Sequence, residues 1–116
     1  MSVAYIVLAI LLSVMLLGSA QGKLTKNEKV VQGLSAANVP QSWYPPLAVI
    51  EIIGAAGLII GIFFSPLGVA AAVGVTLYFV GAVIAHLRAG DTKGASAPAM
   101  ILLIAVAALV VRVLSL

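Results

Sequence analysis

Apolar residues dominate the chain in four long runs, and most polar residues collect between them. The runs cover about residues 3–20, 47–64, 66–87 and 97–116. Each is close to the ~20 residues with which an α-helix crosses the hydrocarbon core of a bilayer. A segment in lipid must satisfy its own backbone hydrogen bonds, so each run is predicted to be a transmembrane helix. The first run lacks a preceding basic region and is long for a signal sequence, so we expect it to be retained.

The apolar stretch from Leu47 to Leu87 is too long to be a single span and must be divided. Ser65-Pro66 is the natural division, because proline suits the first turn of a helix and disrupts a helix interior. The resulting connection is very short. We therefore expect the second and third helices to be antiparallel neighbours.

The one long polar connection, residues 21–46, has a helical pattern of its own. Its apolar side chains fall on one face at helical spacing: Val30, Val31 and Leu34. Thr25, with Glu28 three residues later, fits a capping box. We expect a short helix over residues 26–37, lying in the membrane interface. The predicted fold is therefore all-α: one domain over residues 1–116, a four-helix membrane bundle with an interfacial helix between its first two spans.

Composition supports a bilayer environment for this bundle. Of the 116 residues, 64% are hydrophobic and 8% are charged, whereas a soluble domain is about 25% charged. A chain this small could not bury so much apolar surface away from water. Cysteine is absent, which excludes disulfides and thiol chemistry, and no catalytic or metal-binding motif occurs. We therefore do not expect the chain to be an enzyme on its own, or to bind nucleic acid.

The basic residues give a prediction of orientation. Five of the six lie in the first and third connections, which share one side of a four-span bundle: Lys23, Lys26, Lys29, Arg88 and Lys93. The positive-inside rule then places both polar connections in the cytoplasm and both termini outside, as in a bacterial inner or cell membrane. Arg112 is the exception, and we expect its side chain to extend to the outer headgroups.

Glu51 is the only acidic residue inside a long apolar run. The predicted topology places Lys23, His86, Arg88 and Asp91 at the same end of the bundle, so we expect a polar cluster there. On a helical wheel Arg88, rather than His86, falls on the small-residue stripe of the third helix, and we expect it to face the bundle. Two interpretations stay open: a salt bridge that joins the helices, or a proton or ligand site.

Small residues recur at helical spacing in the second and third spans, where they favour close packing of helices. The glycines concerned are Gly54, Gly57, Gly61, Gly74 and Gly81. Tyr78 interrupts the stripe of the third helix, and a tyrosine hydroxyl in an apolar environment needs a partner. Tyr78 is therefore a candidate pocket residue beside the polar cluster.

Three short motifs carry a family resemblance: Gly22-Lys23-Leu24 after the first span, Glu51 followed by Gly54 and Gly57, and His86-Leu87-Arg88-Ala89-Gly90-Asp91 after the third. Together they resemble the DoxX-like family of small four-helix membrane proteins. DoxX itself is associated with thiosulfate:quinone oxidoreductase as a membrane subunit, and a eukaryotic relative is an assembly chaperone of nicotinic acetylcholine receptors. The resemblance thus implies a fold and the polar signature Lys23, Glu51, His86, Arg88 and Asp91, but no single activity.

Three functions are compatible with these features. The first is a non-catalytic membrane module or accessory subunit, which packs against itself or another membrane protein and holds a lipid or quinone-like molecule near the polar cluster. The second is a small subunit of a quinone-linked oxidoreductase, with the redox centre supplied by a partner. The third, a proton-coupled transporter, is disfavoured because the four-helix exporters it resembles carry their glutamate in the first helix and have weak charge bias.

Overall fold

Helices account for all the regular secondary structure between residues 3 and 115, the part of the chain that this computed structural model describes. In chain order they are α1 (Val3–Leu24), α2 (Glu28–Ala36), the 3-10 helix η1 (Gln41–Trp43), α3 (Tyr44–Ile60), α4 (Ser65–Arg88) and α5 (Ser96–Leu114). By length and composition α1, η1 with α3, α4 and α5 can each cross a membrane. The prediction of an all-α bundle with four spans is confirmed.

Two helices differ from their predicted boundaries in ways that affect the site. The first span continues one turn past residue 20, so Lys23 lies within α1. The second begins at Tyr44 and takes both following prolines into its first turn, where they displace no helical hydrogen bond. It also ends at Ile60, before the predicted residue 64. The predicted end of the fourth helix, Leu116, lies outside the described residues.

The start of α2 differs from the predicted capping box. Asn27 is the N-cap, and its side chain accepts a hydrogen bond from the Lys29 backbone N–H at 3.0 Å. The Thr25 hydroxyl instead donates back to the Gln21 carbonyl at 2.8 Å. The capping-box prediction is wrong because α1 extends far enough to offer Thr25 a carbonyl four residues before it.

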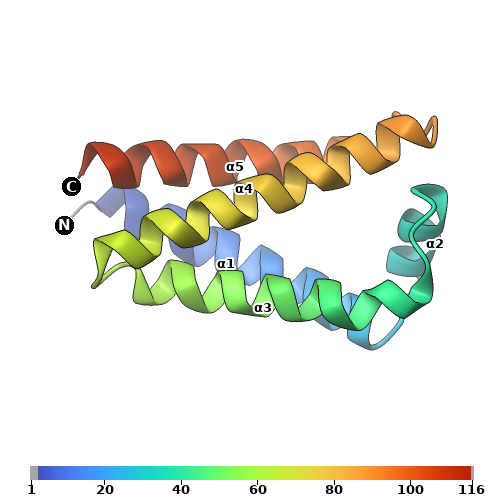
Figure 1. The fold of residues 1–116 in the computed structure, drawn as a ribbon, viewed down its shortest axis with the longest axis horizontal. Coiled ribbons are helices and arrows are strands. Elements are labelled where there is room, and N and C mark those ends of the chain that lie inside the picture. The colour runs from blue at the N-terminus through green and yellow to red at the C-terminus, as the bar shows by residue number, and fades with distance from the viewer. Residues whose placement is uncertain (1–2, 116) are drawn as a thin grey trace.

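The helices form an elongated bundle about 40 Å long, with the two described ends of the chain at one end (Figure 1). The α3–α4 connection lies at that end too. The opposite end carries α2, which lies across it, and the α4–α5 loop. Helices α1 and α3 form one antiparallel pair, and α4 and α5 form another.

The α1–α3 pair is joined by buried side chains and by long-range hydrogen bonds between the two helices. Its buried residues recur at helical spacing: Tyr5, Ala9, Leu12, Leu16, Ala55 and Leu58. The Tyr5 hydroxyl donates to the Leu58 carbonyl at 2.9 Å, and the Ser13 hydroxyl donates to the Ala55 carbonyl at 3.3 Å. Large apolar side chains cover the outer faces of the same helices, as expected for surfaces that meet lipid.

Glycines let α3 and α4 touch near their short connection. A Cβ added at Gly61 would collide with the Gly68 backbone. A Cβ at Gly57 would lie 2.8 Å from Ala71 Cβ, and one at Gly54 would lie 2.9 Å from Val75 Cγ2. From this contact the two ribbons diverge towards the α2 end (Figure 1).

Gly74 and Gly81 do not serve this packing. A Cβ added at either would have no atom within 4 Å, and both residues line grooves. The expectation of close helix packing at these two positions is therefore wrong within the chain. The buried face of α4 lies elsewhere, through Gly68, Ala72, Val75, Phe79 and His86.

Candidate functional site: a buried ion pair beside an apolar groove

The buried face of α3 carries one charged residue. It repeats at helical spacing through Tyr44, Ala48, Glu51, Ala55 and Leu58. Glu51 occupies the middle of this face and is 1% exposed. Its position in the repeat turns the carboxylate inwards, towards the bundle.

Lys23 supplies the opposite charge from the last turn of α1. Its Nζ lies 2.6 Å from Glu51 Oε1 and donates a further hydrogen bond to Ser19 Oγ at 2.7 Å. Lys23 is 6% exposed, so both charges are removed from solvent. Such a pair is tolerated in an apolar interior because each charge neutralises the other. The pair joins α1 to α3 near the α2 end of the bundle.

The hydrogen bonding of the Glu51 carboxylate is incomplete. Its Oε2 is buried and has no hydrogen-bond partner among the described residues, and the buried Tyr44 hydroxyl also has none. The Tyr78 hydroxyl, from α4, lies close enough to interact with the Glu51 carboxylate. Buried acceptors without partners are uncommon and costly in folded proteins, so an unpaired carboxylate oxygen is a candidate binding group.

Three apolar grooves meet at Tyr78. The first, about 300 Å³, lies between α3 and α4 and includes Glu51, Gly54, Gly74 and Tyr78 in its lining. The second, about 280 Å³, lies between η1, the residues after α2, and α4. The third, about 370 Å³, lies beneath α2 and includes Lys23 and His86. The polar centre is thus reached from three sides of the divergent helices.

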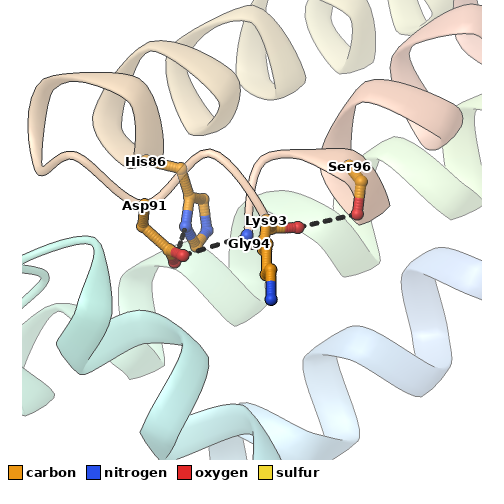
Figure 2. A network of polar contacts seen from close by, with 5 residues as sticks. All are labelled: His86, Asp91, Lys93, Gly94 and Ser96. Carbon is orange, nitrogen blue, oxygen red and sulfur yellow. Dashed lines mark hydrogen bonds and ion pairs between the residues drawn. The ribbon is translucent and has the colours of Figure 1, made fainter.

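A second polar contact closes the α4–α5 loop (Figure 2). His86 Nδ1 lies 2.9 Å from Asp91 Oδ2, and the Gly94 N–H donates to Asp91 Oδ1 at 3.0 Å. A carboxylate only accepts, so Nδ1 carries the proton of this bond. The bond from His86, followed by the bond from Gly94, holds the pKa of Asp91 below its ordinary value. Asp91 therefore fixes the loop against the end of α4.

The lowered pKa of Asp91 gives a pH prediction. The stabilisation from these bonds is complete above the ordinary aspartate pKa of 3.8 and is lost as pH falls through the lower pKa of the folded state. The NMR shift of the Gly94 amide proton should therefore titrate with a midpoint below 3.8. Asp91→Asn should abolish this titration. A midpoint at or above the ordinary value would contradict the contact.

The structure divides the expected polar cluster into two parts. Lys23, Glu51 and Tyr78 come together, whereas His86 binds Asp91 and meets Lys23 only across the third groove. Arg88 is exposed and takes part in neither group. We expected Arg88 to face the bundle because the glycine stripe of α4 was assumed to be its packed face. The packed face is instead the one that carries His86, so this expectation is wrong.

Arg112 also differs from expectation. It does not extend to the headgroups but is 5% exposed, with its guanidinium carbon 5.1 Å from the centroid of the Tyr5 ring. Its Nη1 donates to Ser115 Oγ at 3.3 Å, and its Nε has no hydrogen-bond partner within residues 3–115. A cation–π contact with a neighbouring helix replaces the expected contact with lipid.

Sequence reasoning also missed Ser19, whose hydroxyl oxygen accepts a hydrogen bond from Lys23 Nζ. Ser19 precedes Lys23 by one helical turn, and this i, i+4 spacing was the available signal. It was hidden because residues 21–24 were assigned to a loop.

Comparison with known proteins identifies a family. A sequence model of the DoxX-like family matches residues 7–108, which include the ion pair, Tyr78, the three grooves and the His86–Asp91 contact. No curated protein and no solved structure matches the chain.

Proposed function

The chain belongs to the DoxX-like family of membrane proteins, and on that premise we propose that it is a non-catalytic membrane module that holds an amphipathic molecule of the bilayer. The polar head of this molecule, a lipid or a quinone-like ring, would lie at the Lys23–Glu51 pair. Its apolar part would lie in the groove between α3 and α4.

The observation that carries this proposal is the unpaired Glu51 Oε2 beside an apolar groove. Ile50, Ile53 and Leu67 are exposed and line the same groove, so it opens on the lateral, lipid-facing surface. A ligand could enter from the membrane without crossing the headgroup region. Binding would supply the missing hydrogen bond in a site that water does not occupy freely.

The groove is the right size and character for part of a small amphiphile. Its volume of about 300 Å³ is at the lower end of the ~300–1,000 Å³ of typical ligand pockets. Its lining is apolar apart from Glu51 and Tyr78. A few polar groups in an otherwise apolar cleft orient a ligand, while the apolar lining supplies most of the contact area.

Filling the groove tests the proposal. A Cβ at Gly74 meets no atom, so Gly74→Leu should occupy the groove without disturbing the helices. Gly18→Leu is the matched control, because Gly18 is a helical glycine of α1 with equally open space and lines none of the three grooves. Native mass spectrometry of the purified proteins should find a bound lipid or quinone in wild type and Gly18→Leu. In Gly74→Leu it should be at least about tenfold less abundant.

Two results would contradict the proposal. One is wild-type protein that is folded and carries no small molecule after extraction in a mild detergent. The other is Gly74→Leu that keeps its melting temperature and also its bound molecule. Both variants are expected to melt at or slightly above the wild-type temperature, because replacing a helical glycine favours the helix by roughly 0.5–1 kcal/mol.

The accessory role and the orientation belong to the same proposal. The module would present its ligand to a partner protein or a second copy of the chain. Gly81, with open space beside it, is a position where another helix can approach closely. Five of the six basic residues lie on the side of α2 and the α4–α5 loop, which supports a cytoplasmic location for that end and an outside location for both termini.

A further inference from the structure

We infer, resting on the proposed function, that Glu51 sets the hydrogen-bond polarity of the α3–α4 groove. The groove then selects an amphiphile whose neutral head donates a hydrogen bond, namely a hydroxyl-bearing lipid, over one whose head only accepts. The inference follows from three polar groups: the Lys23 ammonium, the Glu51 carboxylate and the Tyr78 hydroxyl.

The first step concerns the hydrogen-bonding role of each Glu51 carboxylate oxygen. Lys23 Nζ is a donor only, and it occupies Oε1 at 2.6 Å. An ion-paired carboxylate has no proton to give, so the remaining oxygen, Oε2, is an acceptor. Within residues 3–115, Oε2 has no hydrogen-bond partner. On the groove side of the ion pair, therefore, Glu51 Oε2 is a buried acceptor that needs a hydrogen-bond donor.

The second step concerns Tyr78, the other polar group of this groove. Its hydroxyl has one proton and two lone pairs, and it interacts with the Glu51 carboxylate. The proton is attracted to the carboxylate, which leaves the lone pairs of the tyrosine oxygen for the groove. Both polar groups then present acceptors to a ligand, whether or not Tyr78 has turned towards Oε2.

The third step excludes charged heads. The Lys23–Glu51 pair is already neutral, so a ligand of either charge would add an uncompensated charge to a buried site. An anionic head would in addition meet the carboxylate oxygen. A neutral alcohol satisfies the acceptors at no cost in charge, and its acyl chain matches the apolar lining.

Two lipids with the same oleoyl chain test the inference. 1-Monooleoylglycerol has hydroxyl donors, whereas methyl oleate has only acceptors. With purified protein in detergent and native mass spectrometry, wild type should retain 1-monooleoylglycerol over methyl oleate by about tenfold or more. Tenfold corresponds to ~1.4 kcal/mol, which is within the range for a hydrogen bond to a charged group. Gly18→Leu should show the same ratio.

Glu51→Gln should reverse this preference. The amide oxygen must stay with Lys23 Nζ, so the amide NH₂ takes the place of Oε2 and becomes a donor. It can donate to the Tyr78 oxygen, which frees the Tyr78 proton for the ligand. Methyl oleate should then be retained at least as well as 1-monooleoylglycerol. Tyr78→Phe, which keeps the carboxylate and the fold, should reduce the preference without reversing it.

The outcomes separate this inference from the proposed function. Binding of both lipids by wild type with no preference, abolished by Gly74→Leu, would overturn the donor selection and leave the ligand module in place. An unchanged preference in folded Glu51→Gln would overturn it too. If Glu51→Gln does not fold, an unchanged preference in Tyr78→Phe and wild type's failure to distinguish the lipids remain decisive. Failure of folded wild type to bind either lipid would overturn the donor selection, whereas folded wild type that carries no small molecule after mild extraction would overturn the proposed function itself.

Discussion

Lys23→Met should lower the free energy of unfolding by about 3–5 kcal/mol, because it leaves a buried carboxylate without its counter-charge. Lys23 and Glu51 are 6% and 1% exposed, and their charged atoms are 2.6 Å apart, so solvent offers Glu51 little compensation. Unfolding by heat or by a denaturing detergent, followed by circular dichroism, would measure the loss. Lys29→Met, which removes an exposed lysine of α2, is the matched control and should change stability little.

The double variant Lys23→Met, Glu51→Leu separates charge from packing. Apolar replacement of both partners of a buried pair is often neutral or stabilising. The double variant should therefore recover most of the stability that Lys23→Met loses, although it destroys the proposed ligand site. A double variant as unstable as Lys23→Met alone would show that the lysine acts through its packing rather than through its charge.

Gly61→Ala should destabilise the bundle by about 1–3 kcal/mol, because the added methyl group must push two helix backbones apart. A Cβ at Gly61 collides with the Gly68 backbone, which cannot turn away as a side chain could. Gly81→Ala is the matched control on α4. Its Cβ meets no atom, and it should stabilise the helix by roughly 0.5–1 kcal/mol.

The same unfolding measurement serves both variants. The opposite signs of the two changes distinguish helix contact from the general preference of helices for alanine. Equal stabilisation by both substitutions would mean that α3 and α4 do not touch at Gly61. Gly61→Leu should have a larger effect than Gly61→Ala, since the longer side chain would have to find space between the two backbones.

The lengths of the apolar runs were sufficient to predict the four spans. A span has to be apolar along about 20 residues whatever its neighbours are, so the signal lies within each segment. Glu51 could be singled out for the same reason, because a carboxylate in an apolar run needs an explanation without any knowledge of packing. Lys23 followed from topology, which brings the end of α1 level with the start of α3.

The errors concern which face of a helix meets which neighbour. Nearly every face of a transmembrane helix is apolar, so the contrast that identifies the buried face of a soluble helix is weak here. For this reason Arg88 was expected to face the bundle, whereas in the structure His86 is buried and Arg88 is exposed. Arg112 was assigned to the headgroups because nothing in its own segment shows that the Tyr5 ring of α1 lies beside it. These contacts depend on helix rotation, which a single sequence determines poorly.

Helices α3 and α4 touch at the Gly61–Gly68 contact and diverge from it, so this contact can act as a pivot for rotation of one helix relative to the other. Gly61 follows Glu51 by ten positions in the chain, which is about 15 Å at a rise of ~1.5 Å per residue. A relative rotation of only ~4° at the pivot would then move the two helices by ~1 Å at the level of Glu51. Hydrogen bonds are sensitive to changes of this size. The lateral pressure and thickness of the surrounding bilayer would therefore act directly on the width of the groove, and membrane composition would tune how firmly the groove holds the proposed ligand.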